Sequence, residues 1–225
     1  NFDPNQVMDR KEARKCDRYS LLAIGAAKQA VEDTGMDLEN EDKNRIGVIF
    51  AAGIGGIKTF EEEVTAYAKT KDTIGPKFNP FFIPKMIADI AAGHISMMYG
   101  FRGPNFATVS ACASSTNAIC DAYNYIRLGK ANAIITGGAE AAIAAPGLGG
   151  FNSMNALSTR NDSPETASRP FSASRDGFVM GEGAACLVLE EMEHAVARGA
   201  KIYAEVVGAG LSADAYHLTA THPEG

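Results

Sequence analysis

Two short, almost unbroken apolar runs, 46–52 (IGVIFAA) and 132–137 (NAIITG), constrain the fold of this chain most strongly. Runs of this kind are typical of strands that are buried on both faces of a sheet. Between and around them lie longer segments with helical periodicity. Strands that alternate with helices predict an α/β fold with a largely parallel central sheet.

The remaining elements follow from periodicity and from breaker residues. A helix is expected over 5–35, broken near Asp17 and stopped at Gly35. Further helices are expected at 59–71, 83–99, 113–126 and 192–198. Further strands are expected at 106–109, 179–190 and 201–208, and a flexible bend at 147–150.

The stretch 105–120 (NFATVSACASSTNAIC) places Cys112 between an expected strand and an expected helix. The unpaired N–H groups and the positive dipole end of a helix N-terminus favour an anion, and the thiolate is the nucleophilic form of cysteine. The small residues on both sides allow a tight turn with room for a substrate. A cysteine between a strand and a helix is nevertheless more often a packing residue. No glycines flank it at G-x-S-x-G spacing, so this is not the elbow of the α/β-hydrolases.

Composition narrows the function classes. The chain has 225 residues and a net charge of −6, which argues against general nucleic-acid binding. No apolar run approaches the ~20 residues that span a bilayer, and no signal peptide opens the chain, so no membrane is expected. The four cysteines show neither C-x-x-C nor metal-binding spacing, which predicts no metal and a reducing, cytoplasmic setting. The glycines that follow 46–52 match no nucleotide-binding motif, and no cofactor is expected.

Several stretches, taken in order, resemble the β-ketoacyl-[acyl-carrier-protein] synthases, the condensing enzymes of fatty-acid synthesis, and the type II enzymes most closely. They are FAAGIGGI at 50–57, NPFFIPKMIADIAAGHISMMYGFRGPN at 79–105, TVSACASSTNAI at 108–119, ITGGAEAA at 135–142, ALSTRND at 156–162, SRPFSASRDGFVMGEGAACLVLEE at 168–191 and DAYHLT at 214–219. The resemblance implies the thiolase-like fold, in which two similar halves pack as α-β-α-β-α layers. This chain would cover mainly the first half.

The resemblance also implies roles for individual residues. Cys112 would be the acylated nucleophile, and its own backbone N–H would form part of an oxyanion hole. Ile54, Phe82 and Phe151 would line the acyl tunnel, with Phe82 reaching across a homodimer interface; ordinary core or dimer packing is the alternative for each of them. The family's two catalytic histidines lie in downstream HGT and GH motifs, and a G-F-G-G loop acts as a gate. No such motif occurs here, so Cys112 is the sole catalytic candidate.

Basic residues recur at three- and four-residue spacing near the start of the chain, in Arg10, Lys11, Arg14, Lys15 and Arg18. A solvated helix face is the simpler explanation of such a pattern. The resemblance implies that Arg10, Lys11, Arg14 and Lys15 dock an acidic acyl carrier protein. The loop 160–183 is interpreted as a network of arginine–carboxylate pairs, and Asp214 and His217 as residues beside the gate. His94 and Cys186 are expected among core side chains.

Three alternatives stay open. A thiolase-like acyltransferase on coenzyme A thioesters would share fold and nucleophile. A non-catalytic partner subunit would share the fold but typically lacks the cysteine, and an unrelated cysteine hydrolase would need no carrier protein. The chain starts without methionine and stops in a loop-like THPEG. Residues 1–225 are therefore expected to be the N-terminal part of a longer synthase and, by themselves, inactive in condensation.

Overall fold

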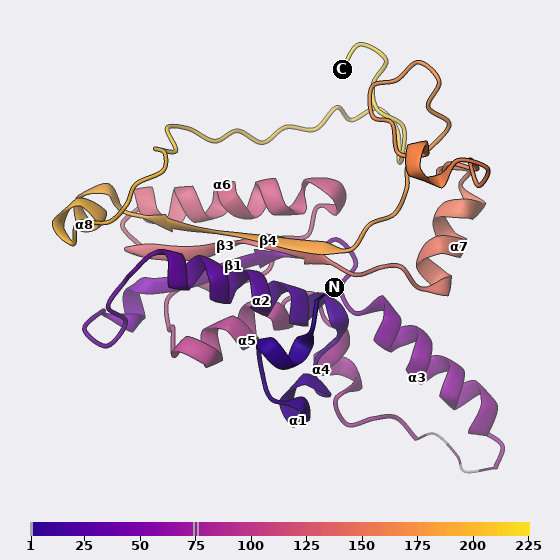
Figure 1. Ribbon diagram of the computed structural model, residues 1–225, viewed down its shortest axis with the longest axis horizontal. Coiled ribbons are helices and arrows are strands. Elements are labelled where there is room, and N and C mark those ends of the chain that lie inside the picture. Colours follow the sequence, from indigo (N-terminus) through magenta and orange to yellow (C-terminus); the bar gives the residue numbers. More distant parts are fainter. Residues whose placement is uncertain (1, 74, 76) are drawn as a thin grey trace.

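A four-stranded sheet in the order β2-β1-β3-β4 forms the centre of the computed structural model, which describes residues 2–73, 75 and 77–225 (Figure 1). The strands are β1 (Ile46–Ala51), β2 (Asn105–Phe106), β3 (Ala133–Glu140) and β4 (Gly183–Glu190). β1 runs parallel to both β2 and β3, whereas β4 is antiparallel to β3. The expected α/β class and largely parallel sheet are confirmed, with one antiparallel edge strand.

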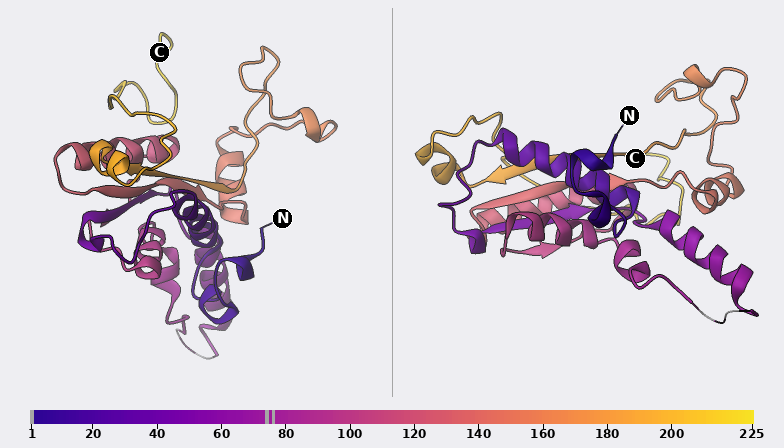
Figure 2. Two further views of the ribbon diagram at one scale, coloured as in Figure 1. Left: turned by 60° about the vertical axis from the view of Figure 1, so that its left-hand side comes forward. Right: turned by 60° about the horizontal axis from the view of Figure 1, so that its bottom comes forward.

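Helices cover both faces of this sheet, which explains why β1 is apolar at every position (Figure 2). Helices α2 (Arg18–Asp33) and α5 (Ile90–Tyr99) pack on one face, and α6 (Ser114–Arg127) packs on the other. Because successive side chains of a strand point to opposite faces, Val48 and Phe50 join the core under α2 and α5. Ile49 and Ala51 join the second core under α6.

The shorter elements lie around this three-layer unit. They are η1 (Pro4–Gln6), α1 (Arg10–Ala13), η2 (Lys43–Arg45), α3 (Ile57–Thr70), α4 (Phe82–Met86), η3 (Ala111–Ala113), α7 (Ala145–Ser153), η4 (Pro164–Thr166) and α8 (Met192–Ala197). Helices α3 and α7 lie beyond the end of the sheet at which β1 and β3 finish, and α8 lies at the opposite end (Figure 1).

One buried carboxylate explains the helix break near Asp17, which is confirmed, whereas the helix expected before it consists only of η1 and the four-residue α1. Asp17 caps α2 by accepting a hydrogen bond from the backbone N–H of Tyr19. Its other oxygen accepts hydrogen bonds from the backbone N–H and the hydroxyl of Thr59, at 3.0 and 2.6 Å, in the first turn of α3. The same side chain thus satisfies donors at two helix N-termini. Helix α2 ends as expected before Gly35, which has a φ of +59°.

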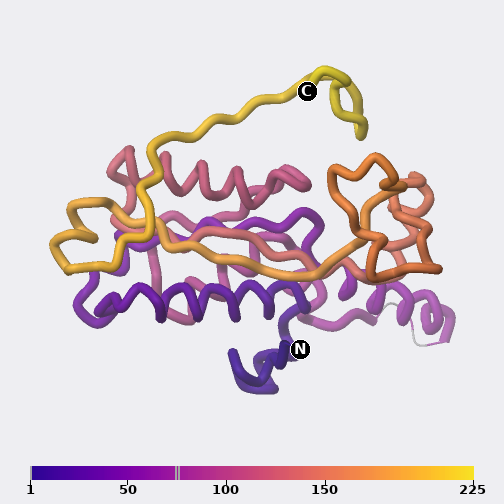
Figure 3. Tube along the Cα trace, turned by 45° about the horizontal axis from the view of Figure 1, so that its top comes forward, coloured from indigo at the N-terminus to yellow at the C-terminus, as the bar shows by residue number. Residues whose placement is uncertain are grey.

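Four local expectations were wrong. The helix expected over 83–99 is interrupted after Met86, where Ile87 is extended and its carbonyl accepts a hydrogen bond from the Tyr19 hydroxyl. The expected bend at 147–150 lies inside helix α7. The expected strand at 106–109 is limited to β2, Asn105–Phe106. Residues 201–208 are exposed and irregular, and the segment that follows α8 runs back along the molecule without joining the sheet (Figure 3).

Candidate active site around Cys112

Cys112 lies in the short η3 turn between β2 and α6, and its side chain is exposed. Ala111 just before it has a φ of +51°, a strained conformation for a residue with a Cβ and one that clusters at functional sites. The first turns of α6 hold this strain in place. The Ser114 hydroxyl accepts a hydrogen bond from the Ser110 N–H and donates one to the Ala111 carbonyl, at 2.8 and 2.6 Å, and Asn117 donates to the Ser110 hydroxyl at 2.7 Å.

A second turn, 53–55, follows β1 and lies against the Cys112 turn. Glu140, the last residue of β3, accepts hydrogen bonds from the N–H groups of Gly53, Ile54 and Gly55, at 2.9, 2.7 and 3.3 Å. A Cβ on Gly53 would lie 2.8 Å from this carboxylate and 3.6 Å from the Ala111 carbonyl oxygen. The structure therefore brings the turn that carries Ile54 next to the turn that carries Cys112.

Glu140 is the residue that sequence reasoning missed. It belongs to the ITGGAEAA stretch, but neither its type nor its spacing pointed to a role. A usable signal was its position, because an acidic residue at the carboxyl end of one parallel strand lies near the turn that follows the neighbouring parallel strand.

The other two expected tunnel residues lie in separate aromatic groups. Phe82 in α4 stacks on Phe78, with ring centroids 5.4 Å apart, and lies 6.4 Å from Phe60 of α3. Phe151 in α7 meets Phe178 edge to face, with centroids 5.1 Å apart. Both groups lie beyond the same end of the sheet as Cys112, since α3 and α7 do.

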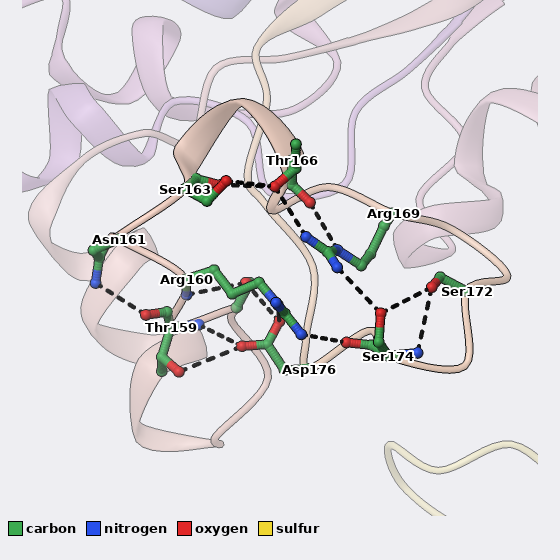
Figure 4. A network of polar contacts seen from close by, with 10 residues as sticks. Thr159, Arg160, Asn161, Ser163, Thr166, Arg169, Ser172, Ser174 and Asp176 are labelled. Atoms are coloured by element: carbon green, nitrogen blue, oxygen red, sulfur yellow. Dashed lines mark hydrogen bonds and ion pairs between the residues drawn. The ribbon is translucent and has the colours of Figure 1, made fainter.

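The loop that carries Phe178 is held by a polar network, as expected (Figure 4). The Asp176 carboxylate accepts hydrogen bonds from the Ser158 hydroxyl and the Thr159 N–H, at 2.7 and 3.1 Å, and lies 3.6 Å from Nε of Arg160. The Ser158 hydrogen bond, followed by that of Thr159, lowers the pKa of Asp176 below its ordinary value. Arg160 also donates to the Ser174 carbonyl at 2.7 Å.

The expected continuous basic face is interrupted, because helix α1 has only four residues. Arg10, Lys11 and Arg14 are exposed, whereas Lys15 pairs with Glu12 at 2.6 Å and lies 5.6 Å from the ring centroid of Phe81. Arg18 belongs to the next helix, α2, and pairs with Glu182 at 2.6 Å. Any basic surface here is therefore made by the residues of α1 and the turn after it.

The histidines make their contacts away from Cys112. Nε2 of His94 lies 3.4 Å from the buried Cys16 sulfur, and burial lowers the His94 pKa. His194 contacts Glu190 and Glu41 at the other end of the sheet. His217 and His222 accept backbone hydrogen bonds in the exposed segment near residue 225.

All four cysteines are free. Cys186, which was expected in the core, is half-buried and packs against the core under α2 and α5, and burial raises its pKa to about 12. Among the described residues, no group of three or more His, Cys, Asp and Glu side chains is arranged to hold a metal ion. None of the helices in that part of the chain combines the length and the apolar character needed to cross a bilayer.

Known proteins resemble this chain over most or all of its length. The family model "Beta-ketoacyl synthase, N-terminal domain" matches residues 1–195. A 3-oxoacyl-[acyl-carrier-protein] synthase 2 of Staphylococcus aureus (strain N315) is 50% identical over 225 residues, which are 100% of this chain and 53% of that protein. The chain thus spans about half the length of the curated relatives it matches.

Two solved structures are similar as well. A β-ketoacyl synthase from Burkholderia phymatum STM815 superposes with a TM-score of 0.86 and 36% identity, over 97% of this chain and 53% of that one. A type II polyketide ketosynthase in complex with its acyl-carrier protein gives a TM-score of 0.71 and 26% identity, over 89% of this chain and 54% of that one. The expected thiolase-like fold class is confirmed.

Proposed function

This chain belongs to the β-ketoacyl synthase family, and we propose on that basis that the protein containing it is a 3-oxoacyl-[acyl-carrier-protein] synthase. It would elongate an acyl chain by decarboxylative condensation with malonyl-[acyl-carrier-protein]. The observation that carries the proposal is Cys112, an exposed thiol behind a strained alanine at the start of α6. The presence of Cys112 does not favour a subunit lacking the nucleophile. The family match and the 3-oxoacyl-[acyl-carrier-protein] synthase relative do not favour a coenzyme A acyltransferase.

The proposed chemistry uses this cysteine twice. The Cys112 thiolate attacks the acyl thioester of the carrier protein, so that the acyl group moves to sulfur and the carrier thiol leaves. Malonyl then loses CO2, and the resulting carbanion attacks the Cys112 thioester to form the new C–C bond and release the thiolate. The backbone N–H of Cys112 and the N-terminus of α6 favour the negative oxygen that develops on the way.

We further propose that residues 1–225 are the N-terminal part of this synthase. The chain covers 53% of the Staphylococcus aureus relative, which supports this division. The histidine motifs and the gating loop of the family would then lie in the remainder, and the isolated residues 1–225 would not condense substrates.

Mass analysis of the acylated protein tests the role of Cys112. Full-length protein is incubated with an acyl-carrier-protein thioester, digested and examined for the added acyl mass. The proposal expects that mass on the peptide that carries Cys112. Cys120, which is buried in α6, serves as the internal control. Acyl mass on Cys120, or no acylation of Cys112 by an active preparation, contradicts the assignment.

The carrier protein would dock on Arg10, Lys11, Arg14 and Lys15. The exposure of the first three supports this, and Lys15 connects the group to Phe81 at the start of α4. Opposite charges steer such encounters and make them sensitive to salt. The double variant Lys11→Glu with Arg14→Glu should raise KM for carrier-bound substrates and weaken the salt dependence of KM. An unchanged KM in this variant refutes the docking role.

Ile54, Phe82 and Phe151 would line the acyl pocket. The contact of the Ile54 turn with the Cys112 turn supports the first assignment most directly. We also propose a homodimer with Phe82 at the interface, supported by large exposed fractions on neighbouring rings, 45% for Phe60 and 41% for Phe78. A cytoplasmic location is supported by the four free cysteines. A monomer by sedimentation of the full-length protein would contradict the dimer.

A further inference from the structure

Glu140 binds a neighbouring turn entirely through backbone groups. Its two carboxylate oxygens accept hydrogen bonds from three consecutive N–H groups, those of Gly53, Ile54 and Gly55. The Oε2 atom takes the two shorter ones, at 2.9 and 2.7 Å. Hydrogen bonds to an ionised acceptor are stronger than neutral ones. The backbone of this turn is therefore fixed at three successive residues by one side chain.

The register of the sheet places this side chain where it can reach. β1 and β3 are parallel, and Ala51 pairs with Gly138, so the strands finish side by side. Glu140 is two residues beyond that pair, beside the turn that follows β1. Close packing leaves little space between the parts: a Cβ on Gly138 would lie 2.0 Å from the Ser115 hydroxyl at the start of α6. Strand β3 thus contacts the turn 53–55 through Glu140 and packs against the start of α6 at Gly138.

We propose that Glu140 is a positioning residue that sets the acyl-chain selectivity of the synthase by fixing Ile54 beside Cys112. This inference rests on the proposed function, because it assumes that the space beside Cys112 receives an acyl chain. Without the carboxylate, three N–H groups lose their acceptor and the turn can relax. The Cys112 turn has its own supports, in Ser114 and Asn117, which do not involve Glu140. The wall of the pocket therefore moves while the nucleophile stays in place.

The decisive measurement is the ratio of kcat/KM for a long and a short acyl chain, each on the carrier protein, with full-length enzyme. A difference of one methylene in an apolar pocket corresponds to about 10- to 200-fold in discrimination. We expect Glu140→Ala to change the ratio by about tenfold or more. Glu140→Gln keeps one acceptor oxygen but turns an N–H donor toward the turn, so its change should be smaller. The matched control is Glu190→Gln, at the opposite end of the sheet.

A second readout does not depend on condensation. Cys112 is alkylated with iodoacetamide and with an iodoacetamide that carries a long N-alkyl chain, and the two rates are compared. The Glu140 variants should change the rate with the long reagent and leave the rate with the small reagent almost unaltered. If the wild-type protein does not condense carrier-bound substrates but this shift is seen, the proposed function fails while the role of Glu140 stands.

Three results would overturn the inference. An unchanged ratio in both Glu140 variants removes the role in selectivity. An equal change in Glu190→Gln shows that general loosening of the fold is responsible. Equal slowing of both alkylation reagents means that Glu140 acts on the nucleophile rather than on the pocket. If Glu140→Ala does not fold, Glu140→Gln decides, because it differs from the wild type by a single acceptor and its charge.

Discussion

Two glutamates end adjacent antiparallel strands at opposite ends of the same sheet, and they use their carboxylates differently. Glu140 ends β3 and accepts from backbone N–H groups only. Glu190 ends β4 and is bonded by side chains: Nε and Nη2 of Arg198, both at 2.7 Å, and Nδ1 of His194 at 2.6 Å. Their strand partners, Gly183 and Ala133, mark the two limits of the β3–β4 ladder.

The contacts around Glu190 hold together segments that are far apart in the sequence. Arg198 also donates to the carbonyl of Thr34 at the end of α2, and His194 reaches Glu41 at 3.2 Å. These contacts connect α8, β4 and the segment after α2. The end around Glu140 instead holds a glycine-rich turn, a strained alanine and an exposed thiol. A carboxylate that is bonded only to backbone N–H groups fixes the conformation of the turn 53–55. We therefore expect variants at the Glu190 end to affect stability and variants at the Glu140 end to affect function.

The variant Cys112→Ala should separate an effect on function from an effect on stability most clearly. Loss of a catalytic nucleophile lowers turnover by several orders of magnitude, and we expect at least about a thousandfold loss of condensation. Because the side chain is exposed, Tm should stay near that of the wild type. Cys120→Ala is the matched control, since Cys120 is buried and its truncation should lower Tm and preserve turnover. Normal condensation by Cys112→Ala would show that the end of the sheet near Glu140 does not carry the catalytic nucleophile.

Arg198→Ala tests the other end. It leaves Glu190, whose side chain is 9% exposed, without its bidentate partner. Loss of one partner costs about 3–5 kcal/mol for a buried pair and up to about 1 kcal/mol for a surface pair. For this partly exposed pair we expect a loss of about 2 kcal/mol in the free energy of unfolding, measured by denaturant titration of the full-length protein. Acyl-chain selectivity should not change.

Arg198→Lys refines the result. Lysine keeps the charge but not the planar pair of donors, so this variant should recover only part of the stability. A wild-type free energy of unfolding in Arg198→Ala would show that the contacts around Glu190 do not stabilise the fold. Altered selectivity in either variant would show that the two ends are coupled.

The sequence predicted the features that depend on local pattern. The apolar runs identified β1 and β3, the helix break was expected near Asp17, and the motif around Cys112 located the turn. Features that depend on distant partners were missed. Helix α4 ends before Ile87, whose carbonyl accepts a hydrogen bond from the hydroxyl of Tyr19 in α2. Glu140 gains its role only from the register that places its strand beside β1.

Two misjudged segments show the limits of residue propensity. Glycines at 147–150 suggested a bend, yet they lie in α7, which begins with a proline at its first turn. Residues 201–208 carry a strand-like sequence but are exposed and pair with no strand in the described part of the chain. Strand propensity reflects packing on a sheet, and here no neighbour provides it.

The smallest expected effect concerns pH and belongs to His194. Its hydrogen bond with Glu190, together with the nearby Glu41 carboxylate, raises the His194 pKa above the ordinary 6.5. Because the folded value is the higher one, the stabilising effect is complete below pH 6.5 and disappears as the pH rises through the folded pKa. For Glu190, burial acts to raise the pKa, but hydrogen bonds from Arg198 and His194 outweigh it and lower the pKa below the ordinary 4.5.

The contribution of Glu190 is therefore complete above pH 4.5 and is lost as the pH falls through its folded pKa. Both contributions are complete together only between about pH 4.5 and 6.5. We expect the Tm difference between wild type and His194→Gln to be largest in that range and to shrink at higher pH. Calorimetry of full-length protein at constant low ionic strength measures it. A difference that is independent of pH would mean that His194 stabilises this end by packing rather than by charge.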